Sequence, residues 1–150
     1  MWIPKVTGKE KNQNGWWLEV QKGQAFAWSE APQADPRVLL SPGGGRAAPT
    51  CWFANDYLRF RLVAPDVAPY RLALYWLDYD RNGRAVEVTL ADDFGVLDTQ
   101  QVQTIETAGG VCVQWAARGS VNIEIRKLAG FNLVLSGVFV DRPADDPDLR

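Results

Sequence analysis

The stretch from Tyr70 to Leu90 constrains the fold more than any other part of the sequence. It contains two runs rich in β-branched and aromatic residues, Tyr70–Leu77 and Ala85–Leu90, which flank a short polar segment. Apolar side chains occupy every second position of the later run, as is typical of a strand with one buried face. The polar segment contains Asn82-Gly83, a pair typical of tight hairpin turns. The stretch therefore predicts a central antiparallel hairpin.

Similar short apolar runs recur through most of the chain. They lie roughly 8–12 residues apart and are bounded by glycine, proline, asparagine and aspartate, which is the pattern of an all-β sandwich or barrel. About nine to eleven strands are expected, among them Arg37–Leu40, Val96–Thr107 and Leu133–Val140. No helical apolar stripe is longer than two turns. The predicted fold class is an all-β antiparallel β-sandwich, and the jelly roll is the usual arrangement for so many strands.

The length of 150 residues suits one domain with one core. We assign residues 1–140 to a single β-sandwich domain and residues 141–150 to an acidic, proline-containing C-terminal tail or linker. Met1–Gln13 lacks the apolar region of a signal peptide. The chain is therefore either cytoplasmic or a module of a larger secreted protein.

Charge and composition exclude several functions. The formal net charge is −2 and the basic residues are scattered, so neither nucleic acid nor an anionic membrane is an expected partner. No stretch approaches the ~20 consecutive apolar residues of a membrane span. The chain has no histidine, which removes Ser-His-Asp and Cys-His catalysis and most catalytic zinc sites.

The two cysteines, Cys51 and Cys112, each lie within an apolar, strand-like run. Buried thiols and a disulfide are both compatible with that placement. Their spacing is not the Cys-x-x-Cys of a zinc or redox site.

A short acidic segment resembles the first half of a calcium-binding loop. Asp78, Asp80 and Asn82 place side-chain oxygens at alternate positions before a glycine. Thr89 occupies the position where such a loop requires its bidentate glutamate. The alternative is that the two aspartates accept hydrogen bonds from turn amides and pair with the arginines beside them.

The sequence holds seven tryptophans, more than a core of this size requires. Exposed aromatic faces stack on the CH faces of sugar rings, and flanking polar side chains bind the sugar hydroxyls. Trp16 and Trp17 are consecutive, so in a strand they point to opposite faces and one of them leaves the core. Three others lie mid-strand and are expected in the core: Trp52, Trp76 and Trp115.

The remaining exposed candidates lie at a strand end or in the polar segment. An aromatic residue in such a position is more often a packing residue than a ligand contact, so both interpretations stay open. The candidate ligand contacts are Trp16, Trp17, Trp28, Tyr79 and Arg81.

Paired carboxylates could hydrolyse glycosidic bonds without histidine. Asp92-Asp93 lies in a predicted turn, where both side chains are expected to be solvated. Asp78 and Asp80 lie next to arginines that would keep both carboxylates charged, rather than splitting their pKa values into an acid and a base. A non-catalytic protein is the expectation.

Short motifs in the C-terminal half recur in a known class of module. An apolar strand ends in Asp-aromatic-Asp, and an arginine, a V-x-V strand, a V-L-D-T turn and a closing S-G-x-F segment follow it. The matching segments are Leu77–Asp80, Arg84, Val86–Val88, Val96–Thr99, Val113–Gly119, Val121–Ile125 and Ser136–Phe139. In these motifs the chain resembles the galactose-binding-like β-sandwich modules of bacterial multidomain glycan-active proteins. The glycine- and tyrosine-rich opening of that family is missing from Met1–Gln24.

The resemblance implies a non-catalytic carbohydrate-binding module that binds a polysaccharide or oligosaccharide. Such a module brings a neighbouring catalytic domain of the same parent chain to its substrate, and it is extracellular or secreted as part of that larger protein. The resemblance also allows one structural calcium ion, and otherwise no cofactor.

The alternative is a structural accessory sandwich that packs against a neighbouring domain and binds no sugar. Its additional aromatic residues would form an interface. A sugar platform should show one or two rings flanked by aspartate, asparagine or arginine. An interface should show a broad apolar patch without them.

Overall fold

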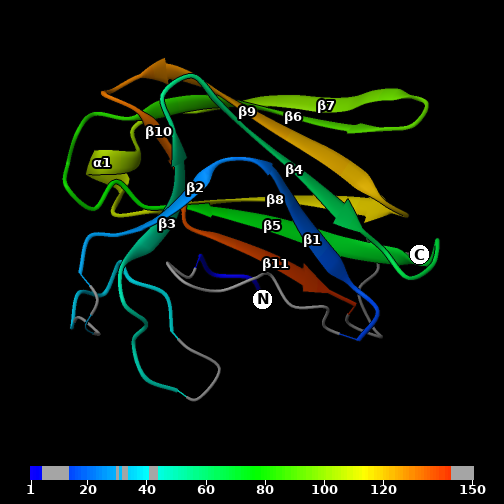
Figure 1. Cartoon of the computed structure of the whole chain (residues 1–150), viewed down its shortest axis with the longest axis horizontal. Helices are drawn as coiled ribbons and strands as arrows, with labels where there is room; N and C mark the ends of the chain where they lie inside the picture. Colours follow the sequence, from blue (N-terminus) through cyan, green and yellow to red (C-terminus); the bar gives the residue numbers. More distant parts are fainter. Residues whose placement is uncertain (5–13, 30, 32–33, 41–43, 143–150) are drawn as a thin grey trace.

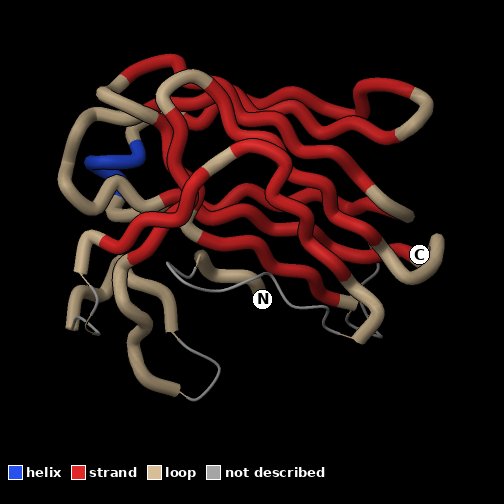
Figure 2. The backbone as a smooth tube through the Cα atoms, in the orientation of Figure 1, coloured by secondary structure: helices blue, strands red, loops and turns tan. Residues whose placement is uncertain are grey.

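The computed structural model describes residues 1–4, 14–29, 31, 34–40 and 44–142. Within these residues strands predominate and the helix α1 is a single turn (Figure 2). The elements are β1 (Trp17–Lys22), β2 (Gln24–Ala27), β3 (Thr50–Ala54), β4 (Tyr57–Val63), β5 (Pro69–Trp76), β6 (Ala85–Asp92), β7 (Gly95–Val102), α1 (Ile105–Ala108), β8 (Val111–Arg118), β9 (Val121–Ala129), β10 (Leu133–Leu135) and β11 (Gly137–Asp141).

The strands form three antiparallel sheets. Their orders are β1-β4-β9-β6-β7, β10-β3-β2 and β11-β5-β8. The sheet of β2, β3 and β10 lies at one end of the molecule beside α1, and the tip of the β6–β7 hairpin lies at the other (Figure 1). Successive strands repeatedly change sheets, as in a jelly roll. The expected all-β antiparallel sandwich is confirmed.

One core fills the space between the sheets. On β5, alternate side chains from Tyr70 to Trp76 have no exposed surface, because a strand directs every second residue to the same face. They belong to the same buried cluster as inward residues of β4, β6 and β9. Burying each large apolar side chain stabilises the fold by roughly 1.5–3 kcal/mol.

The other face of β5 is covered by a loop. The Tyr75 hydroxyl donates a hydrogen bond of 2.5 Å to the backbone oxygen of Arg37. Ala73, also on this outer face, is 9% exposed. This cover explains why the run, after Arg71, is apolar on both faces up to Leu77.

The hairpin predicted for Tyr70–Leu90 is wrong. Strand β5 pairs with β8 and β11, whereas β6 pairs with β7 and β9. The polar segment between them therefore carries the chain from one sheet to another. Gly83 does adopt the positive φ of a turn, 70°. The backbone turn, however, lies at Tyr79 and Asp80, where the Arg81 amide donates to the Asp78 carbonyl, and Asn-Gly cannot specify which strands pair afterwards.

Two predicted strands are divided in the structure. The run Val96–Thr107 ends as strand β7 at Val102 and then forms α1, after Thr104 with φ of 57°. The run Leu133–Val140 forms β10 and β11, which belong to different sheets. Ser136 lies between them, and its amide donates to the backbone oxygen of Tyr75.

The short strand predicted at Arg37–Leu40 is also wrong. Asp35 Oδ1 accepts the Arg37 amide at 2.9 Å and the Asp35 carbonyl accepts the Val38 amide at 3.1 Å, which closes a turn. Leu40 forms only an isolated bridge with Arg46. An aspartate side chain bonding the backbone two residues on competes with strand pairing.

The ends of the described chain are attached to the sandwich. Trp2 pairs with Val138, and β11 extends to Asp141, the first residue of the expected tail. Arg142 then binds Asp66. Most of the segment Met1–Gln13 and the rest of the acidic tail fall on residues 5–13 and 143–150, outside the described residues. No described helix is long and apolar enough to span a membrane.

Candidate ligand-binding site

Two of the predicted ligand contacts, Trp28 and Tyr79, lie against each other. Their ring centroids are 5.4 Å apart and their planes are inclined by 34°. Trp28 directly follows β2, where its amide donates to the carbonyl of Pro49. Tyr79 follows β5 in a different sheet. Both side chains are half-buried, so part of each ring faces solvent.

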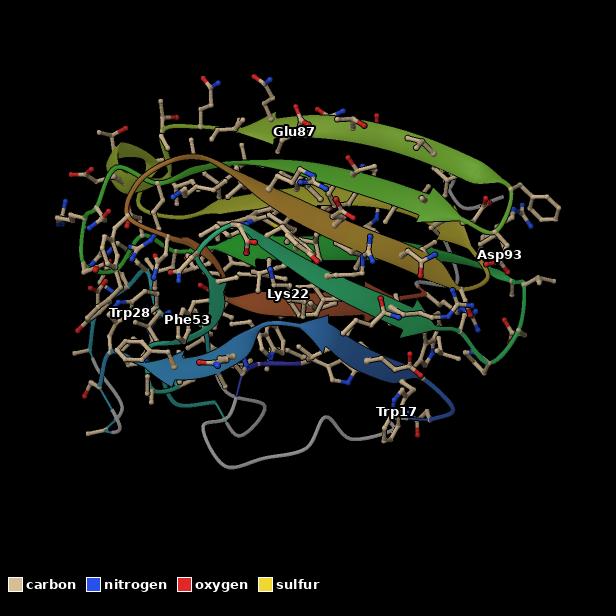
Figure 3. All side chains as sticks on the ribbon, turned by 45° about the horizontal axis from the view of Figure 1, so that its top comes forward. Trp17, Lys22, Trp28, Phe53, Glu87 and Asp93 are labelled. Carbon is tan, nitrogen blue, oxygen red and sulfur yellow. The ribbon has the colours of Figure 1, made fainter. Side chains whose placement is uncertain are left out.

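Two phenylalanines extend this pair over the outer face of β2 and β3. Phe26 and Trp28 are two residues apart, so they share a face of β2; their centroids are 6.1 Å apart. Phe53 of β3 lies 6.0 Å from Phe26. We call Phe53, Phe26, Trp28 and Tyr79 the aromatic row. Trp28 and Phe53 lie at the same end of the sandwich (Figure 3).

Arg84 supports the row from the polar segment. Its guanidinium carbon lies 5.9 Å from the Trp28 ring centroid. The same side chain is 4% exposed, and it binds Asp78 at 2.5 Å, Asp80, and Asn132 at 2.9 Å. Burial alone would lower the pKa of Arg84, but its hydrogen bonds to Asp80 and Asp78 raise that pKa above the ordinary value. Arg84 therefore stays charged and rigidly held.

Arg37 holds the other ring. Its guanidinium carbon lies 5.4 Å from the Tyr79 ring centroid, and its nitrogens donate to the backbone oxygens of Asp78 and Tyr79 at 3.3 and 3.4 Å. Asp35 binds the same guanidinium at 2.7 Å. The hydrogen bond from Arg37 lowers the pKa of Asp35 below its ordinary value. Arg37 thereby joins the loop before β3 to the polar segment.

Arg81 lies exposed beside this arrangement. It has a φ of 53°, and its amide donates to the backbone oxygen of Asp78 at 3.1 Å. The charge of Arg81 makes a minor contribution to the lowered pKa of Asp35. Three arginines and three aspartates gather here, and their formal charges cancel: Arg37, Arg81, Arg84, Asp35, Asp78 and Asp80.

The predicted calcium ligands accept hydrogen bonds from other groups of the protein. Asp78 Oδ1 accepts the amide of Asn82 at 3.0 Å as well as the Arg84 guanidinium, and Asp78 Oδ2 accepts the Arg84 amide at 3.0 Å. Asn82 Oδ1 accepts the amide of Phe131 at 2.7 Å. Arg84 thus supplies the positive charge between Asp78 and Asp80. In the described part of the chain, no group of three His, Cys, Asp or Glu side chains could hold a metal ion.

The structure does not bring Trp16 or Trp17 to the aromatic row. Trp16 is 9% exposed and packs edge-on against Tyr70, with centroids 4.8 Å apart. Trp17 is 39% exposed but lies at the opposite end of the sandwich from Trp28 (Figure 3). The two rings do diverge in burial, as their adjacency on a strand predicts. Neither can share a ligand with Tyr79.

Of the three tryptophans expected in the core, Trp52 and Trp76 are fully buried. Trp115 is half-buried instead, and its indole nitrogen donates to Asp98 Oδ2 at 2.7 Å. Strand β8 is an edge strand of its sheet, which leaves its inward residues only partly covered.

Both cysteines are free thiols. Cys51 is 1% exposed and faces Phe26 across the β2–β3 pair, so it lies under the aromatic row. Burial raises the pKa of Cys51 to about 12. Cys112 is exposed on the edge strand β8, so the structure shows neither a disulfide nor two buried thiols.

A surface pocket of about 530 Å³ adjoins the Phe53 end of the row. Its walls combine one aromatic ring with side chains that can donate or accept hydrogen bonds. The lining residues are Lys22, Gly23, Gln24, Phe53, Ala54, Asn55 and Asp56.

Sequence reasoning missed Phe26, Phe53 and Arg37 as parts of the site. The two-residue spacing of Phe26 and Trp28 was a usable signal, because it places both rings on one face of a strand. Phe53 and Arg37 carry no such signal, since their places depend on strand pairing and on a long loop.

No protein-family model matches the chain, and no curated protein matches its sequence. Two solved structures are similar over most of its length. One is a family 61 carbohydrate-binding module in complex with β-1,4-galactotriose, at 10% identity and a TM-score of 0.48, covering 87% of this chain and 90% of the other. Another is a family 35 carbohydrate-binding module from an environmental isolate, at 13% identity and a TM-score of 0.48, covering 95% and 93%.

A third structure, the enzymatically active domain of tailspike protein 4 from bacteriophage CBA120, is similar at 9% identity and a TM-score of 0.37. The match covers 85% of this chain but 19% of the tailspike chain. At TM-scores and identities this low, the similarities decide neither fold nor ligand, and both are argued from the residues of this chain.

Proposed function

We propose that this protein is a non-catalytic carbohydrate-binding module whose ligand lies on the aromatic row. The observation that carries the proposal is the contact of Trp28 with Tyr79, which are flanked by arginine and aspartate side chains. Aromatic faces bind the CH surface of a sugar, and fixed charged groups bind its hydroxyls. This is the arrangement expected of a platform rather than of a broad apolar interface.

The rings are held before any ligand arrives. Arg84 and Arg37 lie against Trp28 and Tyr79, and each guanidinium is itself fixed by aspartates. Restricting side chains in advance reduces the ordering cost of binding. The cancelling charges of the site suit an uncharged ligand rich in hydroxyl groups.

Asp78 and Asp92, one from each carboxylate pair singled out in the sequence, are committed to structural partners, which supports a non-catalytic role. Asp78 is buried against Arg84 and both of its oxygens accept backbone amides. Asp92 accepts the amides of Phe94 and Gly95 in the β6–β7 turn. A glycosidase needs an acid and a base or nucleophile that face one another across a cleft.

The biological role would be targeting. Binding to a polysaccharide raises the local concentration of substrate around a tethered catalytic domain. We therefore place the module outside the cell, within a larger secreted protein, with a glycan and a neighbouring catalytic domain as partners. It requires no calcium at Asp78, Asp80 and Asn82.

A second candidate is an accessory sandwich that docks on a neighbouring domain. It is favoured by the tip of the β6–β7 hairpin, where Phe94 is 98%, Val96 68% and Leu97 51% exposed. An apolar tip of this kind suits a protein contact. Asp93, next to Phe94 in this tip, lies at the opposite end of the molecule from Trp28 and Phe53 of the aromatic row (Figure 3), so both contacts can exist together.

The test is a titration of intrinsic tryptophan fluorescence with soluble galactan, mannan, xylan, β-glucan and the acidic polysaccharide pectin. We expect a saturable change with one neutral glycan. Trp28→Ala should abolish it, while Trp17→Ala, which removes an exposed ring at the opposite end, should leave the affinity unchanged. No response to any glycan, or equal loss in both variants, contradicts the proposal and favours the accessory sandwich.

A further inference from the structure

We propose that the ligand is an extended oligosaccharide chain that runs the length of the aromatic row into the pocket at Phe53. This inference rests on the proposed glycan binding and adds the form of the ligand and a second contact region. It predicts that the protein binds internal segments of a polysaccharide rather than a single terminal sugar.

The row is longer than one sugar ring. Each step between neighbouring centroids, from 5.4 to 6.1 Å, is of the order of one ring width. A sugar stacked on the exposed surface of Trp28 and Tyr79 therefore cannot also touch Phe53. Exposed surface continues between them, because Phe26 in the middle of the row is 45% exposed. Only a chain of linked sugars can contact the whole row.

The row is not flat, and this constrains the shape of the chain. Phe26 stands edge-on to both of its neighbours, at 90° to Trp28 and 79° to Phe53. The ring faces of Trp28 and Phe53 therefore lie on either side of Phe26, and the rings of the row do not share one plane. A chain that turns between successive units follows such a surface better than a flat ribbon does.

The pocket at the Phe53 end supplies the polar groups that a second contact region needs. Lys22 Nζ binds Asp56 at 2.6 Å and lies 3.6 Å from the centroid of the Tyr57 ring. The charge of Lys22 is thus matched by Asp56. Asn55 adds an amide that both donates and accepts. This region, like the other end of the row, therefore suits neutral hydroxyl groups.

The pocket and the row have a rigid connection. Both belong to the β2–β3 pair, in which Gln24 is opposite Phe53 and Phe26 is opposite Cys51. Gly23 and Gln24 line the pocket. Strand β2 begins at Gln24 and ends at Ala27, directly before Trp28. A ligand bound at one end is therefore held in line with the other.

The experiment measures affinity against chain length. Isothermal titration is carried out with the disaccharide through hexasaccharide of whichever polysaccharide binds in the fluorescence panel. For the unmodified protein we expect affinity to rise with length and then to level off. Phe53→Ala should lower affinity for the hexasaccharide about tenfold, equivalent to about 1.4 kcal/mol, and leave the disaccharide unchanged.

Two further variants make the test decisive. Phe94→Ala removes an exposed ring outside the row and should change nothing. Asn55→Ala removes a polar group of the pocket without touching the core, and should weaken only the longer ligands. Length-independent affinity, or full affinity in both Phe53→Ala and Asn55→Ala, overturns the extended-chain inference while Trp28-dependent binding still stands. Failure of every glycan to bind overturns both proposals.

Discussion

Asp78 and Arg84 form a buried ion pair with a separation of 2.5 Å directly beneath the candidate site. Both side chains are almost inaccessible to solvent, at 0% and 4% exposure. Asp78 also accepts the amides of Asn82 and Arg84 itself, so it organises the whole turn that presents Tyr79. The pair links the stability of the fold to the geometry of the aromatic row.

Asp78→Asn should destabilise the protein by about 3 kcal/mol, because it removes the buried one of the two carboxylates that balance the charge of Arg84. Asp80→Asn is the matched control. The Asp80 side chain is 42% exposed, and exposed pairs contribute about 1 kcal/mol or less. Urea unfolding followed by circular dichroism measures both. Equal losses of unfolding free energy in the two variants would show that the buried Asp78–Arg84 pair contributes no more than the Asp80–Arg84 pair.

The free energy of unfolding should decrease as the pH is lowered in the acidic range. Burial alone would raise the pKa of Asp78, but the amides of Arg84 and Asn82 and the Arg84 guanidinium lower it below its ordinary value. A carboxyl whose folded-state pKa is lowered stabilises the fold above the unfolded-state pKa, about 3.9 for aspartate. That contribution is lost as pH falls through the folded-state pKa.

Unfolding free energies at pH 7 and at pH 3 test this expectation. The unmodified protein should lose more stability between the two than Asp78→Asn does. A pH dependence that is the same in both proteins would mean that other carboxyls, such as Asp35 and Glu124 with pKa values also lowered by arginine, account for the effect.

Removal of calcium should leave the melting temperature unchanged. The side-chain oxygens of Asp78 and Asn82 are occupied by protein donors, and Arg84 already neutralises Asp80. Differential scanning calorimetry with EDTA, and then with added calcium, measures this. A melting temperature that falls in EDTA and recovers with calcium would place a structural cation in the fold.

The two thiols should react very differently. Cys112 is exposed, whereas Cys51 is buried under Phe26 and its pKa is raised to about 12. Because the thiolate is the reactive form, a thiol reagent such as DTNB should modify one equivalent in the native protein and two after unfolding. Cys112→Ser should react only when unfolded. Two fast equivalents in the native state would contradict the burial of Cys51.

Local features of the fold were predictable from the sequence. Period-two patterns mark most strands because each strand buries one face, and the turn at Asp92-Asp93 is confirmed between β6 and β7. The difference in exposure between Trp16 and Trp17 follows from adjacency on an extended chain. The alternative interpretation of Asp78, as a turn-capping partner of arginine, is what the structure shows.

Tertiary structure alone decided which elements meet. Local signals cannot state that β5 and β6 belong to different sheets, because pairing depends on long-range burial and not on the turn between the strands. For the same reason no pattern places Tyr79 beside Trp28, or Phe53 beside Phe26. The sequence by itself determined an all-β chain with surplus aromatic residues. The crossing of the chain between sheets assembled four of those residues into one row.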